Sequence, residues 1–150
     1  MIVEVDQSIK IEQTNHDTAL AFSDGIRHRI LVPARVKREA ISYLRTRGKY
    51  AKRLYLWLFV LALYHLLKDY LNQLTVVVVD VEYPGNEENI KGLLLHLLHR
   101  RTRHLPRIIC QRISRRSAAH KAAIAVIRGD VLPDRVQTTR EFLQPISAEK

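Results

Sequence analysis

The chain has 150 residues, 47% of them hydrophobic, which suffices for one domain with a sizeable core and is too short for two. Its 25 Lys and Arg residues against 15 Asp and Glu give a formal net charge of +10, which predicts a polyanionic partner, either nucleic acid or an anionic membrane surface. The single cysteine, Cys110, excludes an internal disulfide and indicates a reducing compartment, so we expect a cytoplasmic protein.

The first part of the chain predicts three consecutive strands. Residues 2–11 alternate between apolar and polar side chains, the period of a strand with one buried face. Residues 18–23 form a short apolar strand that stops at Asp24-Gly25, a strong hairpin signal, and residues 29–32 form a third strand before Pro33. Tight turns between such strands predict an antiparallel meander.

Two helices are predicted next. From residue 34 the apolar period becomes helical until Gly48, and a second helix, at about residues 51–72, is apolar nearly all round. Its central run, residues 54–67, is shorter than the roughly 20 residues that a membrane span needs. We therefore expect no stable membrane insertion; the helix 51–72 is a core element, a homodimer interface or a peripheral membrane contact.

A buried strand follows and ends in two acids. The four valines at residues 76–79 predict a strand covered on both faces, and Asp80 and Glu82, two residues apart, point to one side of it. Glu87 and Glu88 then begin a helix, and residues 107–113 predict a fifth strand.

The last predicted helix is capped by Ser114 or Ser117 and ends near Gly129. Residues 130–150, with Pro133 and Pro145, predict an irregular extension, so the expected domain covers residues 1–129.

This order of elements resembles the ribonuclease H-like superfamily, which includes ribonuclease H and RuvC-type resolvases. The resemblance covers residues 2–128 and rests on topology and on the placement of acids. It implies a three-layer α/β fold with a mixed five-stranded sheet: an antiparallel meander of strands 1, 2 and 3, parallel strands 4 and 5, and helices on both faces.

The resemblance also implies a metal-dependent active site. Asp6, in the first strand, and Asp80, at the end of the fourth, would lie side by side and bind a divalent metal, and His120 on the last helix would face them. Two metals held by carboxylates stabilise the attacking and leaving oxygens of a phosphodiester, and oxygen ligands favour Mg²⁺ or Mn²⁺. The expected catalytic residues are therefore Asp6, Asp80, Glu82 and His120, with Asp6 and Asp80 as metal ligands.

The chain departs from the family pattern at the remaining ligand. RuvC-type resolvases place a further acid one helical turn beyond His120, where this chain has Ala123, and Glu82 could supply the missing group. Ribonuclease H carries a Glu on the first helix, where Glu39 is available, although a surface ion pair explains Glu39 equally well.

Basic residues form two blocks, one from Arg27 to Arg53 and one between Glu88 and Asp130, where the sequence has no acid. The segment at residues 100–104 is either a solvated loop or a phosphate-contacting one. The expected nucleic-acid-binding residues are Arg100, Arg101, Arg103, Arg115, Arg116 and Lys121.

Two functions follow from these features. The first is a nucleic-acid-binding nuclease or resolvase that hydrolyses phosphodiesters with Mg²⁺ or Mn²⁺. The alternative is a non-catalytic nucleic-acid- or protein-binding module on the same fold with vestigial acids. Zinc spacing and phosphate-binding glycine loops are not found in the sequence.

Overall fold

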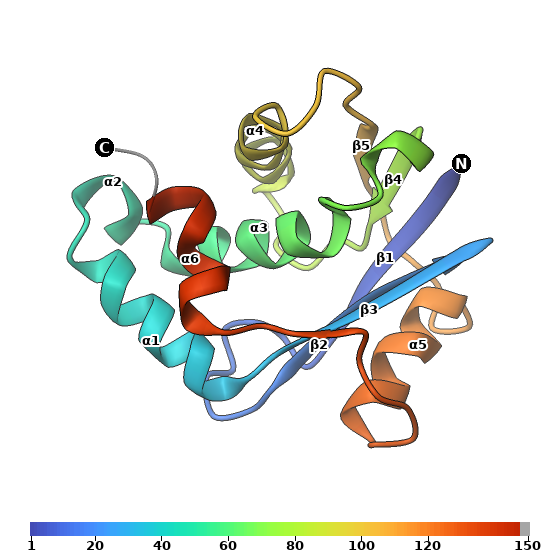
Figure 1. The fold of residues 1–150 in the computed structure, drawn as a ribbon, viewed down its shortest axis with the longest axis horizontal. Coiled ribbons are helices and arrows are strands. Elements are labelled where there is room, and N and C mark those ends of the chain that lie inside the picture. Colours follow the sequence, from blue (N-terminus) through green and yellow to red (C-terminus); the bar gives the residue numbers. More distant parts are fainter. Residues whose placement is uncertain (148–150) are drawn as a thin grey trace.

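The structure, a computed structural model, describes residues 1–147. In this part of the chain the strands form one mixed sheet in the order β5-β4-β1-β2-β3-β6 (Figure 1). The strands are β1 (Ile2–Ser8), β2 (Thr18–Asp24), β3 (Ile26–Val32), β4 (Val76–Val79), β5 (Arg107–Cys110) and β6 (Arg135–Val136).

The expected meander is confirmed, because β1, β2 and β3 pair antiparallel in sequence order. Gly25, at φ +86°, makes the turn between β2 and β3, a conformation that glycine adopts without steric cost. On the other side of β1, β4 pairs parallel to β1, and β5 parallel to β4. β1 ends at Ser8, earlier than the alternation predicts, because Ile9 takes a positive φ of 63° and leaves the extended conformation.

The helices cover both faces of the sheet. α1 (Ala34–Arg45), α3 (Leu54–Leu67), α4 (Glu87–Leu98) and α6 (Thr139–Ser147) lie on one side, and α5 (Ala118–Ile127) lies on the other (Figure 1). Two short turns, α2 (Gly48–Ala51) and η1 (Leu71–Gln73), flank α3. The chain is therefore an α/β protein with a central mixed sheet and helices on both faces.

The hydrophobic cores on the two faces of the sheet differ in size. The larger core lies between the sheet and the layer with α3, and the smaller one joins Ala19 and Ala21 of β2 to Ala123 and Val126 of α5. These small side chains bring α5 close to β1 and β2 and so place its first turn beside the end of β1.

The helix expected at residues 51–72 is shorter and is interrupted. Arg53 lies outside helical geometry, at φ −137° and ψ 48°, and separates α2 from α3. Residues 57–67 are all buried within the fold, so their apolar side chains pack against the rest of the same chain rather than offering a dimer surface. Across residues 1–147, no helix combines the length and apolarity needed to cross a bilayer.

Two details of the expected fold are wrong. The sheet has six strands rather than five in the described residues, because β6 adds to the free edge of β3. Residues 130–147 are not an irregular extension throughout: they include β6 and then α6, whose Phe142 and Ile146 are buried in the main core. Residues 148–150 of the expected extension lie outside the described residues. Pro133 and Pro145 suggested an irregular tail, but Pro133 only precedes β6 and Pro145 lies in the last turns of α6.

Candidate metal centre

The candidate centre lies where β1 and β4 run side by side. Asp6 lies in β1, and Asp80 directly follows β4, where its N–H donates to the Val5 carbonyl at 3.2 Å and extends the parallel ladder by one residue. This pairing sets the two carboxylates on neighbouring strands, at the carboxyl end of β4, where α/β sheets commonly bind ligands. The neighbouring position expected from the sequence is thus the observed one.

Glu82 joins them from the segment after β4. Single carboxylate oxygens of Asp6, Asp80 and Glu82 all lie within 4.8 Å of one another. The three acids line a cavity of about 650 Å³, together with Arg112, Ser114, Arg115, His120 and their neighbours. The structure therefore brings together all four residues expected to be catalytic.

Crowding and burial affect the protonation of these acids. Burial raises the pKa of Glu82 to about 7, and the negative charge of Asp80 and a hydrogen bond to it act in the same direction. Burial also raises the pKa of Asp6, against the hydrogen bond from His120, which lowers it. The raised pKa values show that the ionised carboxylates repel one another and lack stabilising partners. A bound cation would stabilise the ionised forms and lower these pKa values.

His120 contacts Asp6 directly. Its Nδ1 lies 2.7 Å from Asp6 Oδ2, and because an ionised carboxylate only accepts, Nδ1 carries the proton. The backbone N–H of His120 donates to Ser117 Oγ at 3.1 Å. Of the two serines expected to cap this helix, Ser117 is therefore the one that caps α5. The buried face of α5 is formed by Ala119, Ala123 and Val126, and His120 lies at its edge with its side chain 25% exposed.

The loop between β5 and α5 forms another wall of the cavity. The Ile113 N–H donates to Asp80 Oδ1 at 2.7 Å, which ties the loop to the acid cluster. Arg112 and Arg115 line the cavity beside this contact and are both exposed. Two exposed arginines thus flank three carboxyl groups, an arrangement with places for both a metal ion and a phosphate group.

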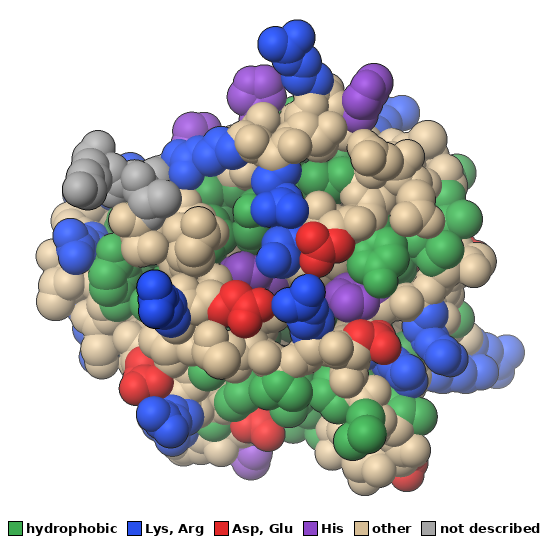
Figure 2. Space-filling view, viewed as in Figure 1, with side chains coloured by type: hydrophobic (Ala, Val, Ile, Leu, Met, Phe, Trp, Pro, Cys, Tyr) green, Lys and Arg blue, Asp and Glu red, His purple; other side chains and the backbone are tan. Residues whose placement is uncertain are grey.

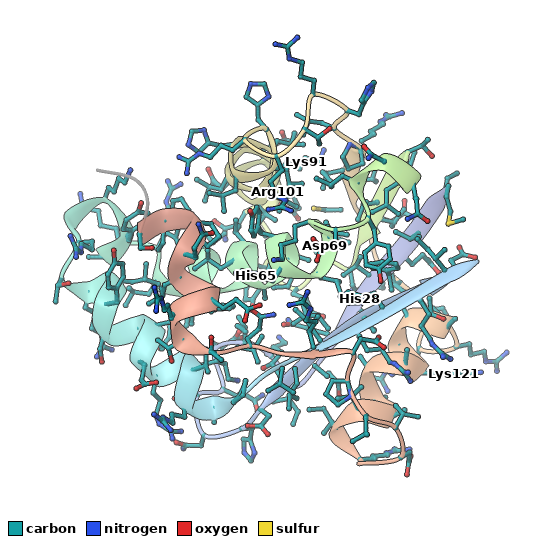
Figure 3. The ribbon with its side chains drawn as sticks, viewed as in Figure 1. His28, His65, Asp69, Lys91, Arg101 and Lys121 are labelled. Carbon is teal, nitrogen blue, oxygen red and sulfur yellow. The ribbon has the colours of Figure 1, made fainter. Side chains whose placement is uncertain are left out.

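The expected nucleic-acid-binding residues fall into two separate groups. Arg115 lines the cavity, and Arg116 and Lys121 are exposed in the adjoining loop and on α5. Arg101 follows α4 in the other layer, and its guanidinium is 3.5 Å from Asp69. Figure 3 shows Arg101 beside Asp69 and Lys121 on α5, across the sheet.

The second group has structural contacts of its own. Arg100 donates to the Pro145 carbonyl at 2.9 Å and so holds the end of α6, and Arg103 is exposed in the loop after α4. Lys, Arg and His side chains gather around α4 and this loop at the top of Figure 2. The basic run in the sequence therefore does not form one continuous surface with the acid cluster.

Two residues of the cavity were missed by the sequence analysis. Arg112 was counted only as part of the basic block, although its place directly after the fifth strand was a usable signal. Gln7 is 7% exposed and lines the cavity, and its side-chain amide has no hydrogen-bond partner within the described residues. A glutamine in an alternating strand gives no signal of this kind.

The two family-based alternatives for a fourth ligand differ in position. Ala123 is 1% exposed and packs against the alanines of β2. Glu39 lies on α1, where it accepts a hydrogen bond from Thr139 Oγ1 at 2.6 Å and pairs with Arg35 at 3.5 Å. Of the acids considered for this role, Glu82 is the one that reaches the cluster.

Comparison of the chain with protein-family models, curated proteins and solved structures found no match. The functional argument therefore rests on the geometry of the site.

Proposed function

We propose that this protein is a ribonuclease H-like, divalent-metal-dependent nuclease or resolvase that hydrolyses phosphodiester bonds in nucleic acid. The observation that carries the proposal is the convergence of Asp6, Asp80 and Glu82 in a cavity that Arg112 and Arg115 also line. The position of β4 beside β1, after an antiparallel meander, supports the resemblance to that superfamily.

The spacing of the acids suits a hard divalent cation. Oxygen ligands of Mg²⁺ lie at about 2.1 Å, so opposite ligands are at most about 4.2 Å apart, and the longer bonds of larger cations allow slightly more. The three oxygens lie within 4.8 Å of one another, so a small inward movement of one side chain would close the set. Mg²⁺ and Mn²⁺ are the cations that carboxylate ligands of this kind select.

Each residue has a separate role in this proposal. Asp6 and Asp80 hold the cation, and Glu82 completes the set in place of the acid that Ala123 does not provide. The cation would stabilise negative charge on the phosphate oxygens during hydrolysis. His120 orients the Asp6 carboxylate through Nδ1, and Arg112 and Arg115 bind the phosphate backbone.

The test combines metal binding with cleavage. Mn²⁺ binding is measured by calorimetry, and cleavage is assayed on branched, hybrid and single-stranded substrates with Mg²⁺ or Mn²⁺. Asp6→Asn is expected to abolish cleavage and to weaken Mn²⁺ binding at least ten-fold, because losing a charged ligand costs no less than losing a residue that orients one. The control is Asp130→Asn, which changes an exposed acid beyond α5 and is expected to leave both cleavage and Mn²⁺ binding unchanged. Cleavage by Asp6→Asn at the unchanged rate would contradict the proposal.

One observation favours the non-catalytic alternative. Both Asp6 oxygens and one Asp80 oxygen already accept hydrogen bonds from the protein, from Gln7 N, His120 Nδ1 and Ile113 N. Acids used in this way stabilise the fold without a metal. Nucleic-acid binding that is salt dependent, unaffected by EDTA and unaccompanied by cleavage would identify this binding module.

A further inference from the structure

Tyr83 directly follows Glu82 in the irregular segment between β4 and α4, and its side chain is held at two points. Its hydroxyl donates a hydrogen bond of 2.6 Å to Glu12 Oε2, a short bond of the charge-assisted kind. Its ring packs edge-on against Phe59 of α3, with 5.1 Å between the ring centroids.

Glu12 is the fixed end of this contact. It lies between β1 and β2, next to Ile11, which is fully buried. The following residue is held by Lys37, whose Nζ donates to the Gln13 carbonyl at 2.8 Å. Ile9 at φ 63° adds a conformation that is unfavourable for a β-branched residue and persists only where surrounding contacts impose it. The segment after β1 is therefore held firmly in one conformation.

The segment that carries Glu82 is irregular. It lies beyond the last ladder hydrogen bonds of β4 and contains Pro84 and Gly85, the latter at φ +88°. Within this segment the Asn86 N–H donates to the Tyr83 carbonyl at 3.1 Å. The bond between Tyr83 and Glu12 thus connects the irregular segment that carries Glu82 to the segment that continues the Asp6 strand.

We propose that Tyr83 and Glu12 are positioning residues, which hold the Glu82 carboxylate within reach of a cation bound by Asp6 and Asp80. This inference rests on the proposed function, because it presupposes that the acid cluster binds a divalent cation. Partners that orient metal ligands typically contribute about ten- to a hundred-fold to metal affinity.

The test is a double-mutant cycle on Mn²⁺ affinity, measured by calorimetry on the full chain. Tyr83→Phe and Glu12→Ala are each expected to weaken Mn²⁺ binding about ten-fold, and the double variant no further, because both changes remove one bond. Glu12→Gln keeps an acceptor for the hydroxyl and is expected to retain affinity within about three-fold of the unaltered protein. This variant separates the loss of the bond from the loss of the charge.

Tyr70→Phe is the matched control. It also removes one tyrosine hydrogen bond, at 3.3 Å to His28 Nδ1, but at a distance from the acid cluster. Both tyrosine variants are expected to lower the melting temperature slightly, and Tyr83→Phe alone to lower Mn²⁺ affinity. Equal losses of affinity in the two variants, or independent losses in Tyr83→Phe and Glu12→Ala, would overturn the positioning role.

The outcomes also separate this inference from the proposed function. If the unaltered protein binds Mn²⁺, Asp6→Asn does not, and Tyr83→Phe binds normally, only the positioning role is overturned. If the unaltered protein does not bind Mn²⁺, both are overturned.

Discussion

At the scale of single residues, the two groups of arginines should differ in their effect on nucleic-acid binding. Arg112 and Arg115 line the acid cavity, so Arg112→Gln and Arg115→Gln should each weaken binding and reduce the dependence of log K on log salt by about one unit of slope. The measurement is fluorescence anisotropy with a labelled single strand at several salt concentrations. Arg103→Gln removes the same charge from the loop after α4 and should change the slope less. Equal effects at all three positions would contradict a binding surface centred on the cavity.

Glu82 should lower the stability of the metal-free protein, because its charge is confined beside Asp80. Replacement by the isosteric Glu82→Gln removes this repulsion and should raise the free energy of unfolding by about 1 kcal/mol at pH 8. Urea unfolding in EDTA measures this. Added Mn²⁺ should then stabilise the unaltered protein more than the variant; a destabilised variant in EDTA would show that the carboxylate has favourable contacts instead.

At the scale of elements, the docking of α6 depends on a neutral histidine. His65 of α3 is 3% exposed, and its Nε2 donates to the Phe142 carbonyl at 3.0 Å while Nδ1 has no partner in the described structure. Burial lowers the pKa of His65 from 6.5 to about 4, despite the hydrogen bond to Phe142, which raises it. Lys68, Asp69 and Arg101 are the charged groups nearby.

The protein should therefore lose stability as the pH falls. The unfolded chain binds a proton at His65 below pH 6.5, whereas the folded chain does not until about pH 4, so the contribution is complete above 6.5 and is lost between these values. At about 1.4 kcal/mol per pKa unit the loss is about 3 kcal/mol. His65→Gln keeps a donor for Phe142 and should lose less stability over this range in urea unfolding. An identical pH dependence in both proteins would refute the role of His65; His99→Gln, an exposed change, serves as the control.

The sequence predicts some elements of the fold well and others poorly. Alternation and turn residues predicted the meander, and the valine run predicted β4, because each signal is local. β6 was missed because its two residues are exposed and pair only with a strand about a hundred positions earlier. Asp6, Asp80 and His120 were selected through the resemblance to the ribonuclease H-like superfamily, and Glu82 through its position two residues after Asp80. The contact of Tyr83 with Glu12 and the position of Arg112 in the cavity depend on the conformation of loops. Loops have no repeating apolar pattern from which their conformation could be predicted.

At the scale of the whole molecule, the burial of α3 predicts a monomer. Residues 57–67 are packed inside the fold, so the most apolar segment of the chain does not offer a surface to a second copy. Sedimentation velocity at micromolar concentration should give the mass of one chain. A stable dimer would show that another surface mediates self-association.

The proposed function requires that the three acids share one cation. The most direct measurement is a crystal structure determined after soaking with Mn²⁺, with anomalous scattering to locate the ion. The account predicts an anomalous peak about 2.0–2.4 Å from carboxylate oxygens of Asp6, Asp80 and Glu82, with Arg112 and Arg115 at the rim of the same cavity. A cavity without a peak, in which His120 still lies 2.7 Å from Asp6, would contradict it.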